Sequence, residues 1–382
     1  MDVIYLDNNA TTRPAAEVVE AMLPYLREQY GNASSIHRLG QMARRGVDVA
    51  RGQIAQLVGC QESELVFTAG GTEAINTAIR SLLASRGPRK KIVTSTVEHS
   101  ATRELCARLG QDGVHIVEVP VDMLGRLDLA ALEAAVDDET ALVTVMWANN
   151  ETGVIFPISE ISAICKARKV PFHCDATQAV GKLPISAIES GVDAMSFASH
   201  KFHGPKGVGA LFYRKGLRLT PLMIGGPQER ARRGGTENIP GIVGMGKAAE
   251  LAAEHLPRVG QISMKRDRLE RSLIDLIDGT VVHGDPNYRL ANTSNLGFSR
   301  VSADAILIGL AERGLCASAG AACSSGSLEP SHVLKAMKVD RLGAHGAIRF
   351  SLSRYTTDEE IDAAIDVVME VVNKLRQVMP VA

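Results

Sequence analysis

The sequence contains few aromatic residues and no excess of either charge. Phe, Trp and Tyr make up 4% of its 382 residues, and 42 basic side chains are balanced by 43 acidic ones. Proteins that bind nucleic acid or an anionic membrane surface concentrate Lys and Arg, so neither kind of partner is indicated. We therefore expect a small-molecule substrate.

The sequence also lacks long apolar runs and paired cysteines. No eighteen apolar residues stand together, and MDVIYLDNNATT carries acids without a basic leader, so neither a membrane span nor a signal peptide is expected. The six cysteines include no CxxC pair and no His/Cys cluster at zinc spacing. A chain of this length needs no disulfide bonds. We expect a cytoplasmic protein without a bound metal.

Short apolar runs alternate with helical patterns over the first two thirds of the chain. Strands are predicted over 64–69, 91–96, 141–148, 170–175, 194–200 and 209–215, and helices over 71–85, 99–110 and 158–169. This order predicts an α/β fold in which helices flank a largely parallel sheet. Trp147, at the end of one strand, is predicted to lie in the core.

The pattern changes near residue 259, where a proline and a glycine interrupt it. Beyond this point come predicted helices over 264–277, 303–314 and 356–379 and a predicted strand over 347–353. The length of the chain exceeds what one hydrophobic core usually serves. A large domain and a smaller α+β domain are therefore predicted, with the boundary near 258.

Chemically active residues follow the predicted strands, where parallel sheets bind their ligands. They are Gly70, Gly71 and Thr72; His99; Asn149, Asn150 and Glu151; Asp175 and Gln178; and His200 and Lys201. A helix that begins after two glycines offers free N–H groups to a phosphate. Any one of these features alone has an ordinary structural explanation, such as a helix cap or a packed histidine.

Together, four of these features match the requirements of pyridoxal phosphate. The cofactor needs a lysine for its aldehyde, a carboxylate for its ring nitrogen, a phosphate site and usually a flat group on its ring. Lys201, Asp175, Thr72 with Gly71, and His99 are predicted to fill these roles in that order.

Cys323 lies in GAACSSGSLEP, among residues too small to cover it. A free cysteine usually packs in a core, so a turn whose thiol packs against a distant segment is the ordinary explanation. The alternative is a thiol that must remain accessible.

The chain resembles class I cysteine desulfurases of the NifS/IscS type, which have the fold type I of pyridoxal phosphate enzymes and are similar to class V aminotransferases. The motifs that carry the resemblance are YLDNNATT (5–12), GGTEAIN (70–76), VEHSA (97–101), WANNETG (147–153), DATQAVGK (175–182), SHKFHGPKG (199–207), RRGGTEN (232–238), CSSGSLEPSHV (323–333) and IRFSLSRYTT (348–357). The resemblance implies a seven-stranded, mainly parallel sheet in a large domain over 11–258. It also implies that residues 1–10 join 259–382 in the smaller domain.

The implied reaction converts L-cysteine to L-alanine and leaves the sulfur as a persulfide on Cys323. An acceptor protein, such as an iron–sulfur cluster scaffold, would then take the sulfur. In this scheme Lys201 moves the α proton and His99 the proton of the substrate thiol. A loop of Gly, Ala and Ser around Cys323 would give the thiol the freedom to reach both partners.

The resemblance assigns the remaining site residues by position. Arg349 would bind the substrate carboxylate with help from Asn150, and Gln178 would bond the cofactor's ring oxygen. Ser199 and His200 would join Thr72 at the phosphate, although Ala198 replaces a residue that is commonly Ser or Cys. Thr236 would reach the phosphate of a second subunit, which implies a homodimer.

Three other classes remain open on the sequence alone. A selenocysteine lyase or a sulfide-releasing cysteine lyase would share the fold and cofactor without a relay through Cys323. An aminotransferase or kynureninase-like enzyme would have no use for that thiol. A catalytically idle, cofactor-binding partner protein would need neither Cys323 nor Arg349. The identity of any sulfur acceptor also stays open.

Overall fold

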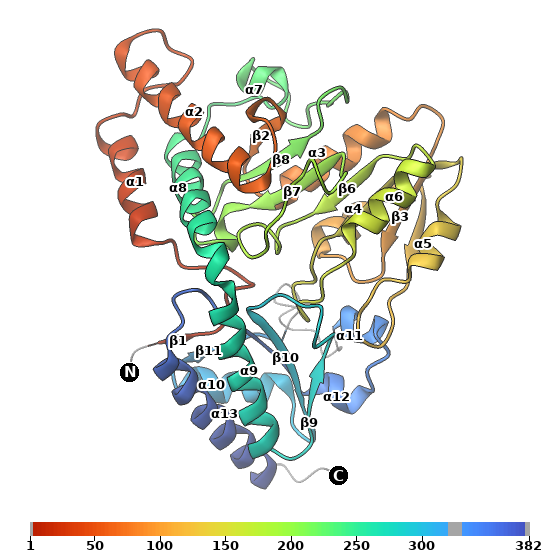
Figure 1. The fold of residues 1–382 in the computed structure, drawn as a ribbon, viewed down its shortest axis with the longest axis vertical. Helices are drawn as coiled ribbons and strands as arrows, with labels where there is room; N and C mark the ends of the chain where they lie inside the picture. The colour runs from red at the N-terminus through yellow and green to blue at the C-terminus, as the bar shows by residue number, and fades with distance from the viewer. Residues whose placement is uncertain (1–2, 320–330, 379–382) are drawn as a thin grey trace.

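A computed structural model describes residues 3–319 and 331–378, which contain a large sheet and two smaller ones (Figure 1). The large sheet has seven strands in the order β2-β8-β7-β6-β5-β3-β4. Their bounds are β2 Leu65–Thr68, β3 Lys91–Ser95, β4 His115–Val119, β5 Thr140–Met146, β6 Phe172–Asp175, β7 Ala194–Ala198 and β8 Gly209–Tyr213. Neighbours from β7 to β4 are parallel, and only β8 runs against its neighbours. The predicted mainly parallel, seven-stranded α/β fold is confirmed.

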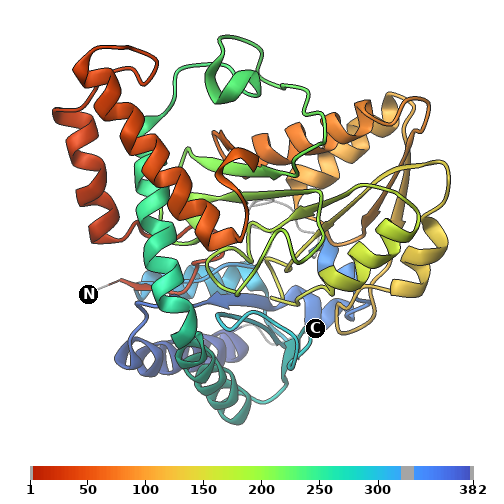
Figure 2. The same ribbon diagram turned by 45° about the horizontal axis from the view of Figure 1, so that its top comes forward.

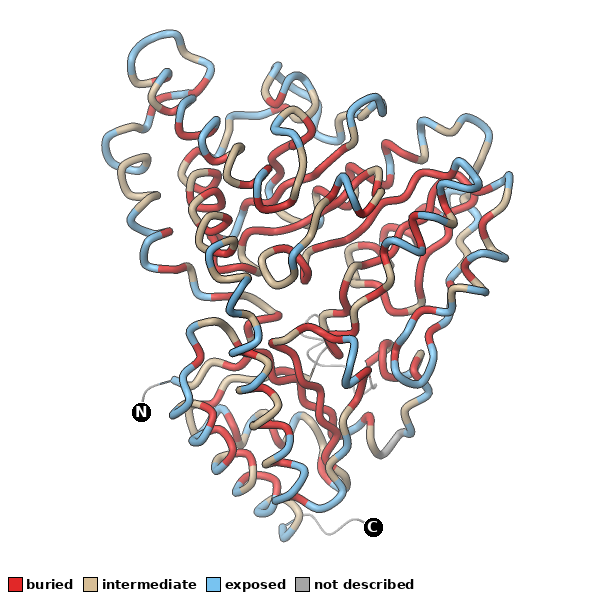
Figure 3. The backbone as a smooth tube through the Cα atoms, viewed as in Figure 1, coloured by how far each residue is buried: buried red, intermediate tan, exposed pale blue. Residues whose placement is uncertain are grey.

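Helices cover both faces of this sheet, as the turned view in Figure 2 shows. They are α1 Ala16–Arg27, α2 Arg38–Val58, α3 Gly71–Ala84, α4 Ser100–Gln111, α5 Leu129–Ala135, α6 Ile158–Ala167, the short α7 Gln228–Ala231 and α8 Ile239–His255. Because both faces are covered, the central strands are buried throughout (Figure 3).

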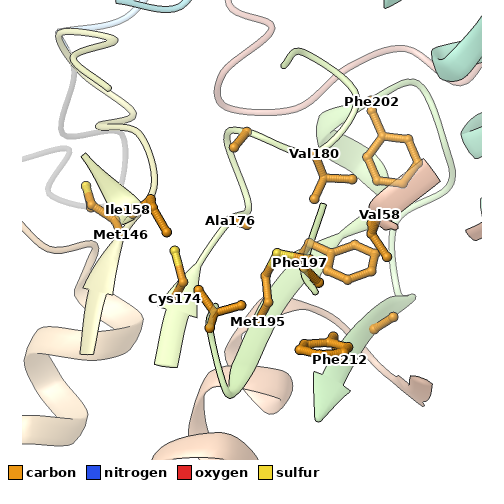
Figure 4. Packing of buried hydrophobic residues seen from close by; sticks show 14 of the residues in the cluster. Val58, Met146, Ile158, Cys174, Ala176, Val180, Met195, Phe197, Phe202 and Phe212 are labelled. Carbon is orange, nitrogen blue, oxygen red and sulfur yellow. The ribbon is translucent and has the colours of Figure 1, made fainter. Parts of the chain in front are cut away.

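Two separate hydrophobic clusters pack against the large sheet. On β8, Phe212 belongs to one cluster and Leu211 to the other, on the side of α3 and α4. Figure 4 shows part of the first cluster, where Phe197 and Phe212 lie near Val58 of α2. Trp147 is half-buried against this cluster.

The C-terminal part of the chain forms an antiparallel sheet with strands in the order β12-β10-β9. Its elements are α9 Val259–Leu276, β9 Thr280–His283, β10 Thr293–Phe298, α10 Ala303–Glu312, β11 Leu315–Cys316, α11 His332–Ala336, α12 Arg341–His345, β12 Ala347–Ser351 and α13 Asp358–Val378. A third hydrophobic cluster packs this sheet against α9, α10 and α13. The N-terminal strand β1, Ile4–Tyr5, pairs with β11.

A 3-10 turn over Leu256–Arg258 separates α8 from α9, at the position where the sequence predicts a domain boundary. The separation of the two parts is incomplete, because Val333 and Leu334 of α11 pack in the cluster of the large sheet. The predicted division at 258 stays a prediction. Among the described residues, no helix is both long enough and apolar enough to cross a membrane.

Candidate active site

A cavity of about 520 Å³ lies at the carboxyl ends of the parallel strands, a size suited to a small-molecule ligand. Its walls come from the N-terminal segment, the first turns of α3 and α4, the ends of β5–β7, and β12. The predicted site residues that line it are Gly71, Thr72, His99, Asn150, Asp175, Gln178, His200, Lys201 and Arg349. Nine residues from six sequence motifs therefore meet at one cavity.

Lys201 is the last residue of the 3-10 turn Ser199–Lys201, which follows β7. Its Nζ donates hydrogen bonds to the backbone oxygens of Asn9 and Ala10, both at 2.8 Å. The N-terminal segment is thus held against the lysine at the edge of the sheet.

Asp175 and His99 line the cavity from two different elements, β6 and the start of α4. Asp175 ends β6, is 5% exposed, and accepts a hydrogen bond from Thr177 N at 3.0 Å. His99 caps α4, with Nδ1 accepting from Ala101 N at 3.1 Å. Burial and then the charge of Lys201 lower the pKa of His99, against the opposing effect of Asp175. The ring is therefore neutral at pH 7, with its proton on Nε2.

The first turn of α3 presents hydrogen-bond donors beside these residues. The first N–H groups of a helix have no intrahelical acceptor, and they carry the positive end of the helix dipole. A Cβ added to Gly71 would lie 3.2 Å from Thr177 Oγ1, so the glycine keeps this corner open. Thr177 Oγ1 is buried and has no hydrogen-bond partner among the described residues. A hydroxyl donor beside a helix N-terminus fits a phosphate group.

Arg349 reaches the cavity from β12 and is 1% exposed. Its Nη2 donates to Asp7 Oδ1 at 2.6 Å, and its Nη1 donates to the Asn150 backbone oxygen at 3.0 Å. These bonds orient the guanidinium, which suits a carboxylate ligand.

Ser199 and Thr236 are not among the nine lining residues. Ser199 is fully buried beside Gly204 and is not part of the cavity wall. Thr236 is exposed and lines a separate cavity of about 110 Å³. Cys323 lies outside the described residues.

Several cavity residues carried no predicted role. Asn9 and Glu151 line the cavity at 1% and 2% exposure, and Asp7 supports Arg349 from behind. Asn9 and Asp7 belong to YLDNNATT and Glu151 to WANNETG, so the motifs marked their segments without assigning the side chains. Glu98, next to His99, is fully buried, and burial raises its pKa to about 8.

The Glu98 carboxyl group connects two strands next to the site. Glu98 Oε1 accepts hydrogen bonds from Ser95 Oγ at 2.6 Å and from Met146 N at 3.0 Å. The two bonds tie the ends of β3 and β5 together beneath His99. With its pKa near 8, the carboxyl group is protonated at pH 7 and brings no second negative charge close to Asp175.

A lysine, an acid and a neutral histidine beside a helix N-terminus, in one cavity at the edge of a parallel sheet, are typical of an α/β enzyme that acts on a small molecule. The chain belongs to the aminotransferase class-V family, whose model matches residues 4–364.

Individual relatives are similar over the full chain. "Cysteine desulfurase 2" of Trichormus variabilis is 50% identical over 380 residues, which cover 100% of this chain and 96% of the relative. A solved structure described as "NIFS-LIKE PROTEIN" is 39% identical with a TM-score of 0.92, covering 98% of this chain and 100% of that one. Another, "SspA in complex with cysteine", is 32% identical with a TM-score of 0.82, covering 92% and 99%.

Proposed function

We propose that this protein is a cysteine desulfurase that carries pyridoxal phosphate on Lys201. The observation that carries the proposal is that Lys201, Asp175, His99 and Arg349 line one cavity. The full-length similarity to a protein named cysteine desulfurase supports the same activity and substrate.

The residues present fit the cofactor in charge and in hydrogen-bonding capacity. The N-terminus of α3 and the hydroxyl of Thr177 would hold the phosphate, together with Thr72 and His200. Asp175 would pair with the ring nitrogen, His99 would cover the ring, and Gln178 would donate to the ring oxygen. Pyridoxal phosphate, when bound, supplies an electron sink that makes the α proton of an amino acid acidic.

The chain's own residues bind the substrate and move its protons. Arg349, oriented by Asp7, binds the substrate carboxylate. Lys201 Nζ takes the α proton as a general base. His99, with its proton on Nε2, exchanges the proton of the substrate thiol.

Cys323 supplies the acceptor thiolate for the sulfur. A sulfur–sulfur bond forms between Cys323 and the substrate, the substrate carbon–sulfur bond breaks, and its electron pair stays on the carbon that becomes the methyl group of L-alanine. The step needs no external oxidant. Both described ends of the segment that carries Cys323 adjoin the cavity: Ser318 pairs with Arg349, and His332 lines the wall.

A homodimer and a sulfur acceptor belong to the same proposal. Thr236 is exposed near Met223 and Ile224, which are 48% and 92% exposed, and such apolar exposure is typical of an interface. Thr236 would complete the phosphate site of the second subunit. The acceptor would be a protein that receives the persulfide, such as an iron–sulfur cluster scaffold.

The proposal is tested by incubating the cofactor-loaded protein with L-cysteine. Alanine should form, and mass spectrometry should find one extra sulfur atom on the peptide that contains Cys323. Cys323→Ala should bind cysteine but lose alanine formation, because no thiolate receives the sulfur. Cys316→Ala, which changes a half-buried thiol in β11, is the matched control and should keep turnover. Undiminished alanine formation by Cys323→Ala would exclude the relay.

A further inference from the structure

Lys182 lies behind the cavity and is bonded to two of its residues. Its Nζ donates to Gln178 Oε1 at 2.6 Å and to Asn9 Oδ1 at 2.9 Å. No role is attached to Lys182 by the reaction described above, although Asn9, one of its two partners, also accepts a hydrogen bond from Lys201 Nζ. Burial, followed by the charges of Lys201 and Arg349, lowers its pKa well below the usual value.

These contacts determine which way the Gln178 amide points. A backbone oxygen can only accept a hydrogen bond, so the Gln178 atom that faces the Asn9 backbone is the amide nitrogen, and the atom that faces the N–H groups of Lys182 is the carbonyl oxygen. Gln178 Nε2 in turn donates to the Asn9 backbone oxygen at 2.9 Å. With its oxygen held by Lys182 and one N–H donated to Asn9, Gln178 has its second N–H left to present to the cavity that it lines.

The same lysine also holds Asn9, whose backbone oxygen accepts from Lys201 Nζ at 2.8 Å. Asn9 Oδ1 accepts from Lys182 and from Asn292 Nδ2 at 3.0 Å, while Asn9 Nδ2 donates to Thr293 Oγ1 at 2.9 Å. With both side-chain ends occupied, the Asn9 backbone has little freedom to turn away from Lys201.

We propose that Lys182 is a positioning residue for the cofactor site, because it helps to hold the Gln178 amide with its second N–H toward the cofactor's ring oxygen. The inference rests on the proposed function, since an acceptor oxygen must enter the cavity for the orientation to matter. Without Lys182, the bond from Nε2 to the Asn9 backbone oxygen still restrains the amide, but the amide turns more easily. An oxygen turned toward the ligand would replace an attraction by a repulsion.

The test is a double-mutant cycle on cofactor affinity. Trp147, the only tryptophan, lies between the cavity residues Met146 and Ala148, so its fluorescence should report binding of pyridoxal phosphate to cofactor-free protein. Lys182→Met and Gln178→Ala should each weaken binding about tenfold, or about 1.4 kcal/mol. The double variant should bind within about twofold of Gln178→Ala alone, because coupled residues give non-additive losses.

Conservative and control variants separate positioning from structural damage. Lys182→Arg keeps the donors, and the small cavity of about 40 Å³ beside Lys182 gives the longer side chain room, so affinity should return to within about threefold of wild type. Lys166→Met changes an exposed lysine of α6 and should bind like wild type. Thermal unfolding of each variant checks that it is folded.

The outcomes are distinct. Unchanged affinity in Lys182→Met, or a loss of about a hundredfold in the double variant, overturns the inference, since additivity means that Lys182 acts independently of Gln178. If Lys182→Met does not fold, a wild-type-like affinity in Gln178→Ala overturns it equally. If wild type binds no pyridoxal phosphate, the proposed function fails and the inference fails with it. If wild type binds and forms alanine while Lys182→Met matches it, only the inference fails.

Discussion

Arg349 Nη2 and Asp7 Oδ1 form an ion pair of 2.6 Å, although the residues are 342 positions apart in the chain. The pair joins strand β12 to the bend after β1 and leaves Arg349 directed at the cavity. Because truncating one partner of a buried pair leaves the other charge poorly compensated, the geometry of Arg349 depends on Asp7.

Asp7→Ala should raise KM for L-cysteine about tenfold and change kcat less, because substrate positioning and not proton removal is affected. Asp7→Asn keeps an oxygen acceptor and should recover part of the loss. Steady-state kinetics of both variants, with the exposed Asp138→Ala as control, check the prediction. An unchanged KM in Asp7→Ala would show that Arg349 is held by its other contacts.

Lys201→Ala should abolish covalent attachment of the cofactor, because the aldehyde needs this amine. Borohydride reduction, denaturation and mass spectrometry should find a labelled lysine in wild type and none in the variant. Lys206→Ala changes an exposed lysine of the same motif and should keep the label. A label that persists in Lys201→Ala would show that the cofactor is attached to another lysine, such as Lys182.

Asp175→Asn should slow removal of the α proton at least about a hundredfold, which equals about 2.7 kcal/mol of barrier, because the ring nitrogen loses its anionic partner. Substrate binding should change less, since Arg349 is the residue proposed to bind the carboxylate. The measurements are the release of deuterium from α-deuterated L-cysteine and the amount of bound cofactor per chain. A wild-type rate of deuterium release at full cofactor occupancy would show that Asp175 is not the partner of the ring nitrogen.

His173 should make the protein less stable as the pH falls from about 6.5 to about 4. The residue is fully buried between Thr144 and Ser196, and burial lowers its pKa to about 4. In this window the unfolded chain binds a proton on His173 and the folded chain does not, so the free energy of unfolding decreases by about 3 kcal/mol.

The measurement for His173 is urea unfolding at pH 4 and pH 6.5. His173→Gln should show a smaller decrease than wild type by that amount, because the amide does not titrate. His115→Gln changes an exposed histidine and should retain the wild-type dependence. Parallel curves for wild type and His173→Gln would mean that the folded protein accepts the proton without cost.

The sequence by itself predicted the fold class and nine residues of the cavity wall. Apolar strands alternating with amphipathic helices leave a parallel sheet as the consistent arrangement, and strand polarity then brings His99, Asp175 and Lys201 to one edge. These are local signals, since each residue follows its own strand directly in the chain.

Only the tertiary structure decided which side chains complete the site. Asp7 meets Arg349, and Asn9 meets Lys182 and Lys201, because β1 pairs with β11 and the following segment crosses the edge of the large sheet. Likewise, the 3-10 turn after β7 puts His200 in the cavity wall and Ser199 in the core. Such contacts join segments far apart in the chain, so no local periodicity encodes them.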